Sequence, residues 1–342
     1  MKFSDNYILY PLNRVLERVI SDSRDLLTAE QSKSLFPDRS LTVADNFLHS
    51  RGNFEQQLFS SNVFESMIEA LEAELTDELR QKSAQDWAEL QNRLGNILAA
   101  HAQQTQNSYF YEKALACFNA ALEEYTQEES PLEWAETQAN LGTALQAQGR
   151  LESSSKLLGK AVDAYTAALL EYTKTKTPEE WKLVMLQLGM TLHGYGLQLK
   201  GNRNFQKSVV AYKNAISELD ADNYPFEYAA AFNNCGAVLH NLAESEENPE
   251  RMEEAIRAYE TAGTVWLEQQ RPVHLSVLSR VNKITALSVL AEMKNDTALA
   301  DEVADEFEII IECFPHALQP LTLKYCEEQM AKMREMAESS AA

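Results

Sequence analysis

Two of the six histidines of this chain, His193 and His240, stand 47 residues apart. Imidazole is a frequent metal ligand and general acid or base, so one interpretation is a metal site or an acid–base pair. A closed metal site needs three or four ligands, and no third ligand occurs at a matching spacing. The interpretation we favour places both side chains on the polar wall of a binding groove. We therefore expect no metal and no cofactor.

The chain lacks the common catalytic motifs. It has no G-x-x-x-x-G-K-[ST] phosphate loop, no G-x-G-x-x-G turn, no H-E-x-x-H zinc motif and no G-x-S-x-G nucleophile turn. Its four cysteines form neither a C-x-x-C pair nor a cluster with zinc spacing. Such cysteines are typical of reduced cytosolic proteins, and the N-terminal residues have no apolar run long enough for a secretory signal. We expect a cytoplasmic protein that is not an enzyme.

The formal net charge of −22 restricts the partners that this chain can attract. Nucleic acids and anionic membrane surfaces bind basic proteins, so we expect neither as a partner. The sequence also contains no run of about 18 apolar residues, which a membrane-spanning helix requires. Two explanations of the excess acid stay open, namely solubility and a basic protein partner.

An internal repeat of 47 residues organises the chain. Six columns of residues keep this interval through four successive units without an insertion or deletion. The columns are Trp87, Trp134, Trp181 and Tyr228; Gly95, Gly142, Gly189 and Gly236; Pro131, Pro178, Pro225 and Pro272; Ala114, Ala161, Ser208 and Ala255; Phe118, Tyr165, Tyr212 and Tyr259; and Ala121, Ala168, Ala215 and Ala262. A fixed period of about 20–50 residues is typical of solenoids, in which each unit packs on its neighbours.

Each unit predicts two helices, A and B. Helix A is clearest over Pro131–Gln148, and helix B of the same unit spans about Leu151–Tyr172. Ser130 and Glu133 indicate a capping box at the start of helix A, with proline at the first helical position. Thr177–Glu180 repeats this device, and Ser83 with Asp86 forms a weaker version.

The glycine column predicts where the two helices meet. Glycine inside a helix costs about 1 kcal/mol relative to alanine, so four glycines at one register need a compensating contact. Close approach of helix B supplies it, with small residues at the crossing and the aromatic column filling the space beside each glycine.

These columns resemble the tetratricopeptide repeat, which has Leu-Gly in helix A and then small, aromatic and small residues in helix B. Leu141-Gly142 and Ala161-x3-Tyr165-x2-Ala168 carry the resemblance, which covers about Ser83–Trp266. The usual repeat has about 34 residues, so these units resemble the longer repeats of many bacterial proteins. The resemblance implies an all-α fold, an α–α superhelix of antiparallel helix pairs, and protein binding.

The 47-residue register divides the chain into three parts. Residues 1–80 are expected to form an N-terminal helical cap or degenerate repeat, with a separate helical domain as the alternative. The expected helices there are Tyr10–Leu27 and Asn62–Leu79, with Ser40–Phe59 between them. Residues 81–317 hold repeats 83–129, 130–176, 177–223 and 224–270 and a weaker one at 271–317, with helices Val273–Met293 and Asp296–Cys313. Residues 318–342 are expected to form a capping helix, Pro320–Ala337, and a frayed tail.

In the tetratricopeptide family helix A lines the concave face, which implies an inward position for the residues at −6, −3, −2, +1 and +4 from the glycine column. The expected groove residues are Asn92, Arg93, Asn96, Glu136, Asn140, Thr143, Gln146, Leu183, Leu186, Gln187, Met190, His193, Asn233, Asn234 and His240, with Arg280 and Lys283 from the weaker repeat. Amide side chains can bond the N–H or the C=O of a bound main chain. Leu183, Leu186 and Met190 either seat an apolar ligand side chain or pack against neighbouring helices.

Three functions remain in competition. The first is a protein–protein interaction scaffold that holds a peptide, a helix or a partner domain in the concave groove. The second is a peptide-sensing regulator, because an N-terminal helical region before about five long repeats resembles bacterial receptors of this family. Residues 1–80 show no helix-turn-helix, and the acidic charge disfavours DNA. The third is an enzyme or metal site around His193 and His240.

Overall fold

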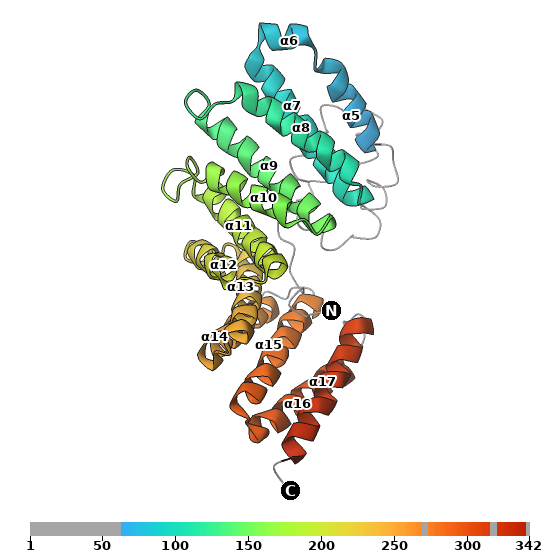
Figure 1. Ribbon diagram of the computed structural model, residues 1–342, viewed down its shortest axis with the longest axis vertical. Coiled ribbons are helices and arrows are strands. Elements are labelled where there is room, and N and C mark those ends of the chain that lie inside the picture. Colours follow the sequence, from blue (N-terminus) through green and yellow to red (C-terminus); the bar gives the residue numbers. More distant parts are fainter. Residues whose placement is uncertain (1–62, 269–272, 315–319, 340–342) are drawn as a thin grey trace. The chain divides into compact units, whose positions relative to one another are not determined.

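The computed structural model describes residues 63–268, 273–314 and 320–339. These residues form thirteen helices, α5 to α17, and no strand. Helices that follow one another in the chain pack together in pairs, an arrangement consistent with the expected α–α superhelical repeat fold (Figure 1). Contacts divide the chain into two compact units between Thr191 and Leu192, inside α11 (Pro178–Leu199).

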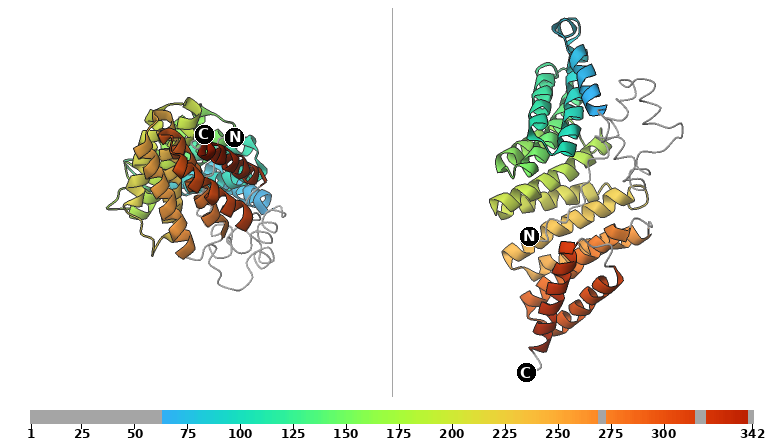
Figure 2. Two further views of the ribbon diagram at one scale, coloured as in Figure 1. Left: turned by 90° about the horizontal axis from the view of Figure 1, so that it is seen from below. Right: turned by 90° about the vertical axis from the view of Figure 1, so that its right-hand side faces the viewer.

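The first unit contains the described residues up to Thr191. Besides the beginning of α11, its helices are α5 (Val63–Glu74), α6 (Asp77–Lys82), α7 (Ala84–Thr105), α8 (Ser108–Glu124), α9 (Pro131–Leu151) and α10 (Ser155–Ala168). α5 and α6 pack on α7, and α7–α8 and α9–α10 form antiparallel hairpins that lie side by side (Figure 2). The expected helix Asn62–Leu79 is divided, because Thr76 caps a new helix by accepting a hydrogen bond from Leu79 N at 3.2 Å. Tyr10–Leu27 and Ser40–Phe59 lie outside the described residues.

The second unit begins at Leu192. After the end of α11 its helices are α12 (Asn202–Ile216), α13 (Pro225–Glu246), α14 (Pro249–Glu268), α15 (Val273–Lys294), α16 (Thr297–Cys313) and α17 (Pro320–Glu338). The helices of the weaker repeat and α17 cover almost the ranges expected from the sequence. α17 buries Cys326 and Met333 against α15 and α16, while Lys324, Glu328 and Lys332 are exposed. α17 therefore has one buried apolar face and one exposed charged face.

Three glycines of the column meet the aromatic column as predicted. A Cβ atom built on Gly95, Gly142 or Gly236 would lie 2.6, 2.9 and 2.9 Å from the ring of Phe118, Tyr165 or Tyr259, respectively. Real side chains do not tolerate such distances, so only glycine permits the helices of these hairpins to approach this closely. The buried rings therefore offset the low helix propensity of the glycines.

Three local predictions about the second and third repeats need correction. The capping box at Ser130 does not form, because Ser130 has a ψ of 60° instead of an extended backbone and its side chain makes no capping bond. The hydroxyl of Thr177 bonds the preceding loop, where it accepts a hydrogen bond from Thr173 N at 2.9 Å. At Ser83 half of the predicted device forms: its hydroxyl accepts from Asp86 N at 3.3 Å, whereas Ser83 N bonds Leu79 O. Helix α10 starts later than predicted, because Ser153 has a φ of 52° and Ser154 caps the helix, and it ends at Ala168 instead of about Tyr172.

Candidate functional site

The expected site residues of the first unit lie on α7, α9 and α11. Half-buried are Asn92, Arg93, Glu136, Asn140, Thr143 and Leu183, and buried are Asn96, Gln146, Leu186, Gln187 and Met190. Asn140 Nδ2 donates a hydrogen bond to Asn92 Oδ1 at 3.1 Å, which joins α9 to α7. We call the five amide side chains Asn92, Asn96, Asn140, Gln146 and Gln187 the amide face of the first unit.

Tyr165 connects the hydrophobic core of the second repeat to the amide face. Its ring is fully buried beside Gly142, and its hydroxyl donates to Gln146 Oε1 at 3.1 Å and lies 3.1 Å from the hydroxyl of Thr143. Burial raises the pKa of Tyr165, so the hydroxyl keeps its proton and stays a donor. The bond holds the Oε1 end of the Gln146 amide toward Tyr165, so Nε2 points away from that hydroxyl.

Two atoms of the amide face are buried without a hydrogen-bond partner in the part of the chain that the structure describes. They are Gln146 Nε2, on a side chain that is 4% exposed, and Gln187 Oε1, on one that is 6% exposed. A buried polar group without a partner destabilises a fold by about 1–3 kcal/mol. One atom is a donor and the other an acceptor, and both lie beneath the surface of the amide face.

His193, in the second unit, is fully buried and bonded to a neighbouring helix. Asn241 Nδ2 lies 2.7 Å from His193 Nε2, and the imidazole meets the ring of Phe205 edge to face at 5.5 Å. An amide nitrogen donates, so His193 Nε2 accepts and its lone pair is already engaged. Burial lowers the pKa of His193 to about 3 and that of His240 to about 4, so both rings are neutral. Within the described ranges, no group of three or more His, Cys, Asp or Glu residues could hold a metal ion.

Asn233 is part of a buried polar network. Its Oδ1 accepts from Ser279 Oγ at 3.0 Å and from Asn282 Nδ2 at 3.1 Å, and Trp266 Nε1 donates to Ser279 Oγ at 3.2 Å. The network joins α13, α14 and α15, so Asn233 has a structural role in this unit. Its neighbour Asn234 is also buried. A sequence signal for the network does exist, since Asn282 stands where the other repeats have leucine or cysteine.

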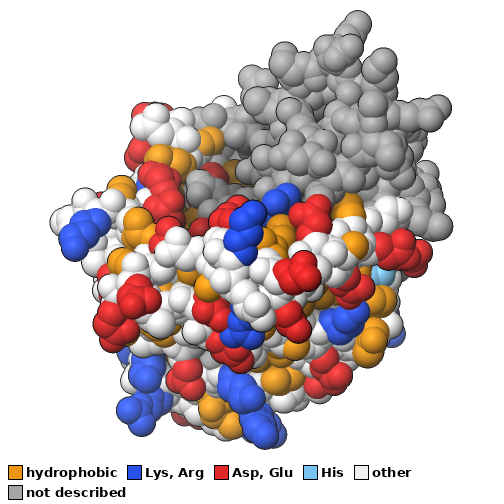
Figure 3. Space-filling model, turned by 90° about the horizontal axis from the view of Figure 1, so that it is seen from above, with side chains coloured by type: hydrophobic (Ala, Val, Ile, Leu, Met, Phe, Trp, Pro, Cys, Tyr) orange, Lys and Arg blue, Asp and Glu red, His pale blue; other side chains and the backbone are white. Residues whose placement is uncertain are grey.

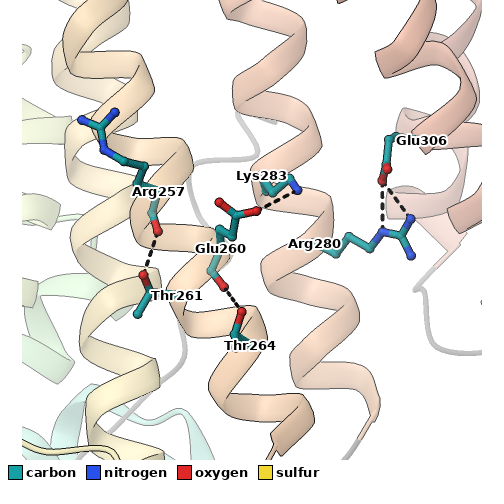
Figure 4. Close-up of polar contacts among 7 residues, drawn as sticks. All are labelled: Arg257, Glu260, Thr261, Thr264, Arg280, Lys283 and Glu306. Carbon is teal, nitrogen blue, oxygen red and sulfur yellow. Dashed lines mark hydrogen bonds and ion pairs between the residues drawn. The ribbon is translucent and has the colours of Figure 1, made fainter.

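Arg280 and Lys283 are both paired with acidic side chains of helices that the sequence assigned to the B position. Arg280 donates to Glu306 Oε2 on α16 at 2.8 and 3.2 Å, and Lys283 Nζ lies 3.6 Å from Glu260 on α14 (Figure 4). These partly exposed pairs contribute little to stability. Both cations already have an acidic partner, so neither is an unpaired charge that could bind a ligand carboxylate.

A hollow of about 380 Å³ lies in the first unit among α8, α9 and α10. Its lining consists of Leu115, Asn119, Gln138, Leu141, Leu145, Lys160, Asp163, Ala164 and Ala167, none of which was expected at the site. Gln138 occupies a column that holds Met185 and Phe232 in the next two repeats. The preceding repeat also has glutamine in this column, at Gln91, so the sequence carries no specific signal for the hollow.

Charges of both signs are mixed on the one face that Figure 3 shows. On the face shown in Figure 3, Asp and Glu side chains are interspersed with Lys, Arg and neutral groups. Arg334 illustrates how the acid is balanced locally, since it contacts Asp301 at 2.7 Å and Glu308 at 3.0 Å. Among the helices described, none is long and apolar enough to cross a membrane.

Comparisons with known proteins give no further guidance, because no protein-family model and no curated protein matches this chain. The functional hypothesis therefore depends on the residues themselves. The peptide-sensing alternative depends on residues 1–80, of which 1–62 lie outside the described residues.

Proposed function

We propose that this chain is a tetratricopeptide-like scaffold of the cytoplasm that binds a polypeptide partner on the faces of α7, α9 and α11. The observation that supports this best is the amide face, where Asn140 bonds Asn92 and where Gln146 and Gln187 each present a buried polar atom without a partner. Amides at successive repeats suit a ligand that carries both donors and acceptors along its length, as a polypeptide does.

The charge of the chain supports a protein partner over a nucleic acid. A net charge of −22 repels phosphate backbones and raises the association rate of a basic protein. The salt dependence of binding measures this contribution, because electrostatic steering falls as ionic strength rises.

An enzyme or metal site around His193 is the weaker alternative. Its Nε2 lone pair accepts from Asn241, and burial keeps the ring neutral, so it lacks both a free ligand atom and a pKa near the working range of a general base. The regulator alternative shares the peptide-binding step with our proposal, and it differs in what residues 1–80 do afterwards.

Site-specific photocrosslinking in the native host tests the proposal. We place p-benzoylphenylalanine at Glu136, beside the amide face, or at Asp163, on the rim of the hollow. Both side chains are acidic and lie on neighbouring helices of the same unit, so each position controls for the other. We expect a partner protein to be crosslinked from position 136 and not from position 163. Crosslinks only from 163 would move the binding site to the hollow, and the absence of a partner from both positions would contradict a scaffold function.

A further inference from the structure

The hollow among α8, α9 and α10 has the size and the apolar floor of a small-molecule site. Its volume of about 380 Å³ lies within the range of about 300–1,000 Å³ that is usual for such sites. The floor consists of Leu141 and Leu145 of α9 and Ala164 of α10, which belong to the hydrophobic core of the second repeat. An apolar group that enters the hollow therefore leaves water for contacts with this core.

The rim of the hollow carries a cation and an anion that have no partner. Lys160 and Asp163 are exposed and stand three positions apart on α10, so they lie on the same face of this helix. Among the residues that the structure describes, no ion pair or hydrogen bond joins either charged group to the other or to a third side chain. On the α8 side, Asn119 uses its Nδ2 to bond Leu115 O at 2.7 Å, which leaves its Oδ1 as an acceptor.

We propose that the hollow binds a free α-amino acid with an apolar side chain, such as leucine. The apolar side chain packs on the floor, the carboxylate of the ligand pairs with Lys160, and its ammonium group bonds Asp163 and Asn119 Oδ1. The two charged groups of an α-amino acid are attached to one carbon atom. They therefore suit a cation and an anion that are neighbours on one helix face.

The charges at the rim favour a zwitterion over a ligand with one charge or none. An anion would pair with Lys160, but Asp163 and the net charge of −22 repel it. A cation would pair with Asp163 and meet the repulsion of Lys160. A neutral apolar molecule would displace water from both charged groups without replacing its hydrogen bonds. A zwitterion pairs with both groups and has no net charge.

This site is separate from the proposed polypeptide site. Gln138 lines the hollow and Asn140 belongs to the amide face, and the two stand two positions apart on α9. Residues at this spacing do not face each other on a helix, so the hollow and the amide face lie on different sides of α9. An amino acid in the hollow does not compete with a polypeptide on the amide face, and either proposal can fail without the other.

A titration of the full chain with L-leucine, followed by ligand-observed NMR, tests the proposal. We expect saturable binding with a dissociation constant of about 0.1–1 mM, which is usual for a ligand of this size. Three probes each lack one part of leucine: 4-methylpentanoate lacks the ammonium group, leucinamide lacks the carboxylate, and glycine lacks the apolar side chain. Each should bind at least about tenfold more weakly. The absence of saturable leucine binding up to about 10 mM, or equal binding of any of the three probes, would overturn the proposal.

Two charge-removing variants test the location of the ligand. Lys160→Gln and Asp163→Asn should each weaken leucine binding about tenfold or more, because each removes one of the two ion pairs. Lys156→Gln is the matched control, since Lys156 is an exposed lysine of α10 outside the hollow, and it should change the affinity less than about twofold. Circular dichroism establishes that all three variants keep the wild-type helicity. Equal leucine affinity of the three variants would place the ligand elsewhere and overturn the proposal.

Discussion

The hydroxyl of Tyr165 donates a hydrogen bond to Gln146 Oε1 at 3.1 Å while its ring covers Gly142. One side chain therefore belongs both to the repeat packing and to the amide face. The residue whose ring packs on Gly142, where α9 and α10 approach closely, also orients an amide of the proposed binding surface. Packing and binding can be separated experimentally at this position.

Tyr165→Phe should reduce binding more than stability. Phe118 occupies the equivalent position in the first repeat, so the ring alone is compatible with this packing. Loss of the hydroxyl should lower the free energy of unfolding by only about 1 kcal/mol. The released Gln146 amide should weaken partner or peptide binding by about threefold to tenfold. Chemical denaturation and a binding titration measure the two effects, and unchanged binding would show that Gln146 does not need this orientation.

The same glycine-to-alanine change should have opposite effects at two positions. Gly142→Ala should destabilise the protein, because the new methyl group would lie 2.9 Å from the buried Tyr165 ring, and Gly142→Leu should cost about 2 kcal/mol or more. Gly263 also lies in a helix, but a Cβ atom there would meet its nearest neighbour at 4.0 Å. Gly263→Ala should therefore stabilise by about 0.5–1 kcal/mol. Thermal denaturation of both variants provides the test, and a stabilising Gly142→Ala would mean that the hairpin is more loosely packed than the structure indicates.

Acidification should destabilise the fold through buried His193. Burial lowers the pKa of this group to about 3 in the folded state, below its ordinary value of 6.5. The unfolded chain then binds more protons as the pH falls below about 6.5, so stability is lost toward lower pH. Between pH 7.5 and 5 this effect amounts to about 2 kcal/mol for one such histidine.

The matched variant for this effect is His193→Gln, which keeps an acceptor for Asn241 but does not titrate. Its urea denaturation curves at the two pH values should differ by about 2 kcal/mol less than those of the wild type. An equal pH dependence in both proteins would show that His193 is protonated in the folded state.

Asn233→Ala should damage the second unit. The substitution leaves Ser279 and Asn282 buried without their common acceptor, so we expect the free energy of unfolding to fall by about 2–3 kcal/mol. Ser279→Ala provides a double-mutant cycle, in which the two effects should be clearly non-additive because both residues belong to one network. Additive effects would indicate that the hydrogen bonds seen here do not persist in solution.

The sequence predicts the fold well because the repeat register records which residues meet. Gly95, Gly142 and Gly236 each face the aromatic residue of their own helix B, as at Gly142 and Tyr165. Capping is predicted less well, since it depends on backbone angles that Pro131 restricts at Ser130.

The site is less predictable than the fold. Counting positions in helix A identified Asn92 and Asn140, which contact one another, but it gave no warning that Asn233 is buried in a network. Lys283 stands in the glycine column itself, and its partner Glu260 comes from the preceding helix B, which a count within one repeat does not reveal. Burial and pairing depend on neighbouring repeats, so a position within a single repeat does not determine them.

The most direct test of the central claim is the affinity of the crosslinked partner for two double variants of the full chain. Asn92→Ala, Asn140→Ala removes the linked amides of the amide face, and Asn119→Ala, Gln138→Ala removes the same number of amides from the hollow. Circular dichroism first establishes that both variants keep the wild-type helicity. We predict that the dissociation constant rises about tenfold or more for the first variant and less than about twofold for the second. The reverse order, or equal affinity of both variants and the wild type, would contradict the assignment of the binding face.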